Sequence, residues 1–214
     1  MKINILISKN SWAIKYEKDL KKELIKFSKK INFIHDHRLI KDKSDVTIIF
    51  SYFKIISKNY LNKSKHNIIP HESKLPKGRG MSPLTWEILK NKTHYYFSLI
   101  EASESLDCGN IYFQKKIKIS KSIIFNEIKK IQYKTNLQLI KKFLKKFRNK
   151  KKITSKKQLG STYLYKRRTP KDSKINVNKT IKEQFNKLRV ADPENYPTFF
   201  EYKKRKFIIK IGSK

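Results

Sequence analysis

Short apolar runs alternate with lysine-rich segments along the first half of this chain. The runs are rich in isoleucine and in other β-branched or aromatic residues, which favour strands, and they cover residues 3–7, 31–34, 46–50, 67–69, 95–100 and 111–113. The run at 46–50 is continuously apolar, which is typical of a strand buried on both faces of a parallel sheet. The sequence therefore predicts several buried strands.

Apolar residues also recur at helical spacing. Ile14, Leu20, Leu24 and Phe27 predict an amphipathic helix after the first strand. A longer helix over residues 122–147 is predicted from an apolar stripe formed by Ile124, Ile128, Ile131, Ile140, Phe143, Leu144 and Phe147. Strands and helices that alternate in this way predict an α/β fold, a Rossmann-like and mostly parallel sheet with helices on both faces.

The composition of the chain changes near residue 150. Residues 148–157 are mostly lysine and predict a solvated linker between a large domain at 1–150 and a small C-terminal extension at 158–214. The extension is too small to bury a core of its own, so we expect it to pack against the large domain.

A helix and a β-hairpin are predicted within the extension. The helix would be capped by Asn178 and would carry Ile181, Phe185 and Leu188 on one face. Residues 199–202 and 207–211 predict the two strands of the hairpin, whose exposed edge would allow a homodimer to form.

Basic residues far outnumber acidic ones. Lys and Arg total 53 against 17 Asp and Glu, which gives a formal net charge of +36. Such an excess suggests a nucleic acid partner, but the lysines are spread over every segment, and no basic patch with interleaved aromatic residues stands out. We therefore expect anionic substrates and cofactors rather than a nucleic acid.

The remaining composition indicates a cytoplasmic protein. Cys108 is the single cysteine, which excludes an internal disulfide and fits a reducing compartment. The first residues lack a cleavage-site pattern, and no apolar run approaches the length of a membrane span. His35 and His37 alternate along the chain, but with no third ligand nearby we expect no metal site.

Residues 66–86 form the stretch around which the chain is organised. A short strand ends at His71, a basic loop rich in glycine and proline follows, and Ser82 with Pro83 begins a helix. Strands that end in such loops build the sites of open α/β sheets, although an ordinary strand–loop–helix connection would look the same. A second loop, at the end of a neighbouring strand, carries Asp107. Histidine and aspartate suit acid–base chemistry, yet from the residues alone either could equally be a cap or a surface group.

Three motifs resemble the folate-dependent formyltransferases. The first is the run from His71 to Gly80, HESKLPKGRG, with Ser82-Pro83 and Trp86 behind it. The second and third are the loop Leu106-Asp107-Cys108-Gly109 and the segment Phe53-Lys54-Ile55-Ile56. The tail from Arg167 to Ile175 is similar to the carboxyl-terminal segment of the small sugar N-formyltransferases.

The resemblance implies transfer of the formyl group of N10-formyltetrahydrofolate to an amine. His71 would move protons, and Asp107 would orient its imidazole and stabilise its charge. The residues implied to hold the folate are Phe53, Lys54, Ile55, Ile56, Leu106 and Asp107.

The family asparagine, two positions before the histidine, is replaced here by Ile69. Asn67 is a candidate substitute, but it lies roughly 13 Å from His71 along a regular strand. Ser73, Asn110, His71 itself or a backbone N–H are the alternatives for binding the oxyanion.

The amine acceptor implied by the resemblance is a nucleotide-linked amino sugar used to build a glycan or lipopolysaccharide. A methionyl-tRNA enzyme normally carries a larger carboxyl-terminal domain than the one expected here. The residues implied to bind the substrate are Lys77, Gly78, Arg79, Gly80, Trp86 and Arg168. The alternatives are a methionyl-tRNA formyltransferase-like enzyme, or a basic nucleic-acid-binding protein on a transferase scaffold.

Overall fold

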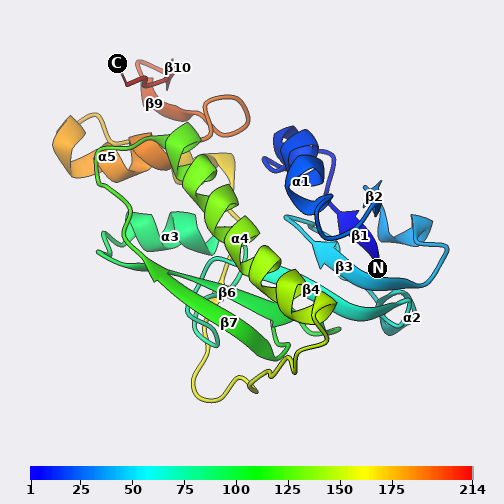
Figure 1. Ribbon diagram of the computed structural model, residues 1–214. Helices are drawn as coiled ribbons and strands as arrows, with labels where there is room; N and C mark the ends of the chain where they lie inside the picture. Colours follow the sequence, from blue (N-terminus) through cyan, green and yellow to red (C-terminus); the bar gives the residue numbers. More distant parts are fainter. Residues whose placement is uncertain (214) are drawn as a thin grey trace.

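A six-stranded sheet forms the centre of the computed structural model, which describes residues 1–213 (Figure 1). The strand order is β2-β1-β3-β4-β6-β7, with bounds β1 Lys2–Leu6, β2 Lys30–Ile34, β3 Ser44–Ile49, β4 Ser64–His71, β6 Tyr95–Glu101 and β7 Ile111–Ile117. The first four strands in that order are parallel, and β6 and β7 are added antiparallel. The predicted α/β fold with a mostly parallel sheet is confirmed.

Helices and apolar side chains cover both faces of this sheet. The helices are α1 Glu17–Leu24, α2 Lys58–Leu61, α3 Pro83–Leu89, α4 Phe125–Arg148 and α5 Ile181–Val190, with short 3-10 turns at Ile14–Tyr16, His37–Leu39 and Pro170–Ser173. The larger apolar cluster joins the sheet to α1, α3 and α4. A smaller cluster on the other face consists of Leu6, Ile49, Ile56 and Leu61, the last from α2.

The long helix α4 runs antiparallel to β4. The ring of His66, near the start of β4, lies 5.4 Å from Phe143 and 5.5 Å from Phe147 between centroids, late in α4. Just past the other end of β4, Glu72 accepts a hydrogen bond of 2.7 Å from Asn136, which is earlier in α4. The first turns of α4 therefore extend beyond the carboxyl end of β4 (Figure 1).

The C-terminal extension packs against the large domain. Its strand β8, Leu164–Tyr165, pairs in parallel with β5, Arg79–Gly80, and its hairpin consists of β9 Thr198–Tyr202 and β10 Arg205–Ile209. Arg189 of α5 is only 1% exposed and donates to the carbonyl oxygen of Ser120 at 2.9 Å. These contacts give the extension the buried surface that it could not form alone.

One local prediction was wrong. Thr180, not Asn178, caps α5, because Thr180 and Glu183 form a reciprocal capping box, with the Thr180 N–H donating to Glu183 at 2.8 Å. The lysine-rich run at 148–157 is exposed at every residue except Ile153, and within it Lys156 exchanges backbone hydrogen bonds of 2.8 and 2.9 Å with Ile111. Local patterns do not reveal a pairing between residues so distant in sequence.

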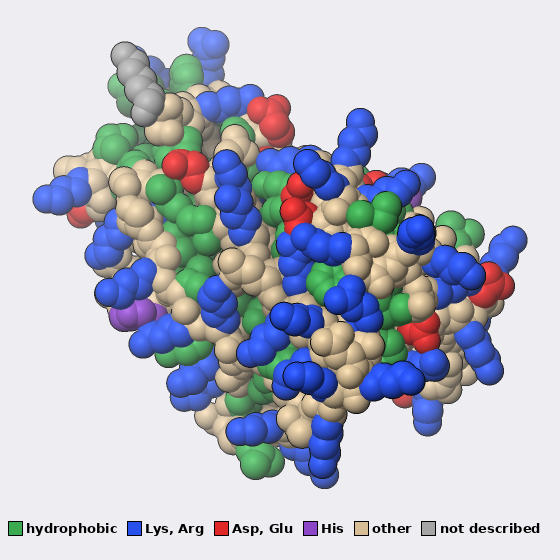
Figure 2. Space-filling model, in the orientation of Figure 1, with side chains coloured by type: hydrophobic (Ala, Val, Ile, Leu, Met, Phe, Trp, Pro, Cys, Tyr) green, Lys and Arg blue, Asp and Glu red, His purple; other side chains and the backbone are tan. Residues whose placement is uncertain are grey.

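Lysine and arginine side chains are spread across the face shown in Figure 2 rather than gathered in one patch. This distribution matches the even spread of lysines along the sequence. Within residues 1–213, no helix has the length and apolar character needed to cross a membrane.

Replacing Phe143 by alanine tests how strongly α4 is tied to the sheet. The Phe143 ring is fully buried beside His66 and Tyr112, so its loss leaves a cavity. We expect Phe143→Ala to lower the free energy of unfolding in urea by about 3–5 kcal/mol. Ile208→Ala, at a hairpin residue that is 58% exposed, should change it by less than about 0.5 kcal/mol. Equal effects of the two substitutions would contradict this description of the core.

Candidate active site

The His71 imidazole and the Asp107 carboxylate lie together at the carboxyl end of β4. Nδ1 of His71 is 3.6 Å from Oδ2 of Asp107, and both side chains are more than nine-tenths buried. Because β6 is antiparallel to β4, Glu101 at the end of β6 pairs with Ile68, three residues before His71. The loop 102–110 must therefore double back along β4 to deliver Asp107. The pair expected from the sequence is brought together by this loop and not by the strand ends themselves.

Several contacts fix the backbone around Asp107. Its Oδ2 accepts a hydrogen bond of 2.8 Å from the Gly80 N–H, and Gln158 donates to the carbonyl oxygens of Asp107 and Gly109 at 2.7 and 2.8 Å. Asp107 has a φ of 52°, in the left-handed region that aspartate tolerates better than most residues. A Cβ at Gly109 would lie 1.6 Å from the carbonyl oxygen of Glu101, so only glycine lets the loop pass here.

The two ring nitrogens of His71 both face acceptors. Nε2 lies 2.9 Å from the carbonyl oxygen of Gly78, and Nδ1 faces Asp107. A neutral imidazole carries a hydrogen on one nitrogen, whereas the imidazolium can donate from both. Two acceptors around one ring suit an imidazole that gains and loses a proton, with Asp107 stabilising the charged form.

Asn67 is not brought to this pair. Its amide Nδ2 donates to the carbonyl oxygen of Leu61 at 2.9 Å, on the α2 side of the sheet. Ile69, at the position where the family has asparagine, packs against the smaller apolar cluster. The structure therefore offers no amide donor from β4 next to His71.

Ser73 and Asn110, the other polar candidates, differ in their surroundings. The Ser73 side chain is 3% exposed, and its hydroxyl has no hydrogen-bond partner among residues 1–213. A Cβ built on Gly78 would meet the Ser73 hydroxyl at 3.5 Å, so this hydroxyl lies against the loop that contacts His71. Asn110 points instead to the Ser155 hydroxyl at 3.4 Å. Of these two residues, Ser73 is the one whose unpaired hydroxyl lies near His71 and Asp107.

The segment 53–56 and the Asp107 loop present apolar side chains to solvent. Phe53, Ile55 and Leu106 are 41%, 68% and 40% exposed, while Ile56 is buried in the smaller apolar cluster. Lys54 forms an ion pair of 2.9 Å with Asp36, whose pKa is held well below its usual range by hydrogen bonds from Arg38 and Lys54. Exposed apolar groups beside a buried cluster are typical of a surface that binds an apolar group.

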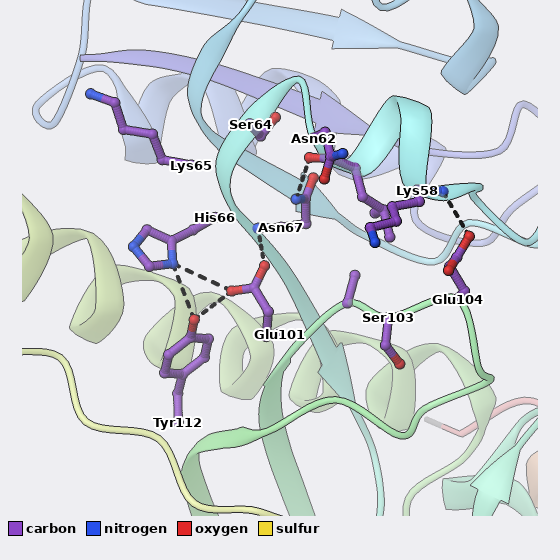
Figure 3. A pocket seen from close by; sticks show the side chains of 12 residues that line it. Lys58, Asn62, Ser64, Lys65, His66, Asn67, Glu101, Ser103, Glu104 and Tyr112 are labelled. Carbon is purple, nitrogen blue, oxygen red and sulfur yellow. Dashed lines mark hydrogen bonds and ion pairs between the residues drawn. The ribbon is translucent and has the colours of Figure 1, made fainter.

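A separate cavity of about 530 Å³ opens at the amino end of β4 (Figure 3). Inside it, Nδ1 of His66 lies 3.1 Å from the Tyr112 hydroxyl, which donates a hydrogen bond to Glu101. Burial and that hydrogen bond raise the pKa of Tyr112. Neither His71 nor Asp107 lines this cavity, so it is distinct from the candidate active site.

The side chains expected to bind substrate differ in whether they are already bonded within the protein. Lys77 is exposed at the loop surface, whereas the Arg79 guanidinium donates to Gln158 at 2.8 Å. Trp86 donates its indole N–H to the Lys166 carbonyl at 3.0 Å and stacks on Tyr165, so it anchors the extension. Binding of substrate by these side chains stays a prediction.

Sequence reasoning missed several residues at this edge. Gln158 follows a lysine-rich run, and nothing in the local pattern marks it as a partner of Asp107. On α4, however, the buried side chains of Gln132 and Asn136 lie one helical turn apart in a gap of the apolar stripe. That gap was a signal in the sequence that the helix carries polar groups toward the site.

Most of the chain matches one known protein family. Residues 15–142, more than half of the chain and including both His71 and Asp107, match the family described as formyl transferase. The chain belongs to this family. The match covers β4, the Asp107 loop and most of α4, which are the elements that form the candidate site.

Curated relatives of this chain include methionyl-tRNA formyltransferases and a bifunctional polymyxin resistance protein. The methionyl-tRNA formyltransferase of Prochlorococcus marinus (strain MIT 9215) is 31% identical over 149 residues, or 66% of this chain and 45% of the relative. The bifunctional polymyxin resistance protein ArnA of Wigglesworthia glossinidia brevipalpis is 32% identical over 178 residues, or 82% of this chain and 27% of ArnA. The chain thus spans about half the length, or less, of the curated relatives that it matches.

Solved structures share the fold of this formyl transferase. The methionyl-tRNA formyltransferase from Clostridium thermocellum has a TM-score of 0.80 at 22% identity, covering 100% of this chain and 94% of that one. A 4-N formyltransferase from Francisella tularensis has a TM-score of 0.67 at 18% identity, covering 98% and 97%. HypX from Aquifex aeolicus in complex with tetrahydrofolic acid has a TM-score of 0.78 at 15% identity, covering 99% and 37%.

Gly109→Ala tests the placement of the Asp107 loop. The added methyl cannot fit against the Glu101 carbonyl, so the loop must shift or the protein must lose stability. We expect a loss of about 1–3 kcal/mol in the free energy of unfolding. Gly212→Ala is the matched control, because nothing lies within 4 Å of a Cβ there. If both variants unfold at the same denaturant concentration, the close approach of Gly109 to Glu101 is wrong.

Proposed function

We propose that this protein transfers the formyl group of N10-formyltetrahydrofolate to the amine of a nucleotide-linked amino sugar. The reaction would take place in the cytoplasm and would supply a glycan or a lipopolysaccharide. The observation that carries the proposal is the buried contact of 3.6 Å between His71 and Asp107 in a member of the formyl transferase family.

In this proposal His71 takes a proton from the amine as it attacks the formyl carbon, and then gives that proton to the folate nitrogen as its bond to the formyl carbon breaks and tetrahydrofolate leaves. The amine would replace the Gly78 carbonyl as the partner of Nε2, while Asp107 holds Nδ1 and stabilises the imidazolium. The Gly80 N–H and Gln158 keep the Asp107 loop in place as His71 changes charge. A fixed carboxylate lowers the cost of forming the charged ring because little reorganisation is needed.

The folate, which supplies the formyl group, would be held by segment 53–56 and by the loop that carries Leu106 and Asp107. Phe53, Ile55 and Leu106 offer exposed apolar surface for a flat ring system, and the smaller apolar cluster supports them from below. Segment 53–56 is held in place by the Phe53 N–H, which donates to the Ser8 hydroxyl at 3.0 Å. These residues fit the group that the family uses.

The acceptor side carries cations that suit a diphosphate. Lys77 and Arg79 lie on the loop after His71, and Arg168 lies in the segment that follows β8. Names among the relatives point to two kinds of acceptor, methionyl-tRNA and, for a structural neighbour named a sugar N-formyltransferase, a sugar. Formylation of methionyl-tRNA is therefore the second candidate function.

An assay that follows tetrahydrofolate release separates these candidates. The protein would be incubated with N10-formyltetrahydrofolate and either a panel of nucleotide-linked amino sugars or aminoacylated initiator tRNA. We expect turnover with a nucleotide-linked amino sugar and none with the tRNA. Turnover with the tRNA alone would replace the first proposal by the second, and release with neither acceptor would remove both.

His71→Ala tests the assigned proton carrier. Loss of a general base lowers turnover by about 10²- to 10⁴-fold, and we expect a fall in that range at saturating substrates. His94→Ala removes a histidine that precedes β6, lies 3.0 Å from the Thr93 hydroxyl and has no role in the proposed mechanism, so it should leave the rate unchanged. Circular dichroism would establish that both variants are folded. A rate close to that of the unmodified protein in His71→Ala would exclude His71 from the mechanism.

A further inference from the structure

The Gly78 carbonyl loses its hydrogen bond in the proposed reaction. In the structure this carbonyl accepts from Nε2 of His71 at 2.9 Å, and Gly78 is buried. When the acceptor amine takes its place at Nε2, the carbonyl is left without that partner. A buried carbonyl without a hydrogen bond costs free energy, and this cost would oppose binding of the amine unless a second donor is at hand.

Ser73 supplies an unused donor beside Gly78. The serine is 3% exposed, and its hydroxyl is buried with no hydrogen-bond partner among residues 1–213. A Cβ built on Gly78 would lie 3.1 Å from the Ser73 Cβ and 3.5 Å from its Oγ, so the hydroxyl lies against the Gly78 backbone with no side chain between them. Because most buried hydroxyls in proteins are hydrogen-bonded, one without a partner calls for an explanation.

Both donors approach Gly78 from the same segment of the chain. The Ser73 N–H donates to the His71 carbonyl at 3.0 Å, so the chain bends sharply between the two residues, and both of their side chains meet Gly78. The other edge of the peptide group between Gly78 and Arg79 is held by the extension, since the Arg79 N–H donates to the Tyr163 carbonyl at 3.1 Å. Glycine has the freest backbone of all residues. The Gly78 carbonyl can therefore pass from His71 to Ser73 by a tilt of its peptide group, without a flip that would break the Arg79 bond.

We propose that Ser73 is a positioning residue for formyl transfer, whose hydroxyl takes over the Gly78 carbonyl when the acceptor amine binds Nε2 of His71. The inference rests on the proposed function only for the arrival of an amine, and it holds for either acceptor considered above. The carbonyl stays hydrogen-bonded in both states, so opening His71 to the amine costs little free energy. This role, rather than contact with the oxyanion, fits a hydroxyl that is buried within the protein.

A double-mutant cycle in unfolding of the full chain tests this hydrogen bond without any turnover. In the unmodified background, Ser73→Ala removes no hydrogen bond and should leave the midpoint of urea unfolding unchanged or raised. His71→Ala takes away the present partner of the Gly78 carbonyl. In that background the Ser73 hydroxyl should bond the carbonyl, so adding Ser73→Ala should lower the midpoint. The same change of midpoint in both backgrounds would overturn the proposal.

Ser98→Ala is the matched control for this cycle. Ser98 is a neighbouring buried serine whose hydroxyl donates to the Ser73 carbonyl at 2.7 Å and accepts from the Gln114 amide at 3.0 Å. Its loss should lower the midpoint by the same amount in both backgrounds, because its partners do not change with His71. A crystal structure of His71→Ala should also show the Ser73 Oγ within about 3.0 Å of the Gly78 oxygen. An Oγ that still has no protein partner in that variant would reject the proposal.

Steady-state kinetics test the role of Ser73 in the reaction. With the acceptor that the tetrahydrofolate-release assay identifies, Ser73→Ala should lower kcat/KM for that acceptor by about three- to tenfold, which corresponds to the loss of one neutral hydrogen bond. KM for N10-formyltetrahydrofolate should be unchanged, because the Gly78 carbonyl gives way to the amine and not to the folate. A role confined to folding would instead lower the unfolding midpoint and affect both substrates alike.

The two experiments separate failure of this inference from failure of the proposed function. If Ser73→Ala leaves kcat/KM for the acceptor unchanged, the function stands and the positioning role is rejected. If neither acceptor is formylated, the proposed function is lost, and the unfolding cycle alone decides whether Ser73 is the second partner of the Gly78 carbonyl. A cycle without coupling rejects the inference whatever the acceptor.

Discussion

The contact between His71 and Asp107 is the constraint on which the site depends. The contact joins the end of β4 to the loop 102–110. This loop begins three residues back along β4, beside Ile68, because β6 is antiparallel to β4. Gly109 allows the sharp approach to Glu101, and the Gly80 N–H and Gln158 hold the returning chain. A carboxylate fixed in this way can stabilise a charged imidazole without reorganising, which is what proton transfer at this position requires.

At the carboxyl end of the parallel strands, the two sides of the sheet differ in chemical character. On the α2 side, the smaller apolar cluster and the exposed apolar residues of two loops offer a surface for a flat ligand. On the α4 side, the contacts are polar: Asn136 donates to the Glu72 carboxylate, and Lys129 donates to Gln132. In the proposed function, the formyl donor would bind on the first of these sides and the charged acceptor on the second.

Much of this could be predicted from the sequence, because strands, long helices and local motifs leave periodic or contiguous signals. The continuous run at 46–50 and the apolar stripe of α4 gave the fold, and the residues around His71 and Asp107 gave the family. The cap of α5 also has a signal in the sequence, because Thr180 and Glu183 form a Thr-x-x-Glu pattern that Asn178 lacks. Gln158 could not be found, since its partners lie about fifty residues away and no rule of spacing connects them.

The central claim is that His71 and Asp107 act as one unit, and a double-mutant cycle on the formyl transfer step tests it most directly. His71→Asn, Asp107→Asn and the double variant would be compared in single-turnover reactions with N10-formyltetrahydrofolate and the acceptor found in the substrate panel. If the two side chains act together, the double variant should be no slower than His71→Asn alone. Losses that multiply would show that the two residues contribute independently and would contradict the account.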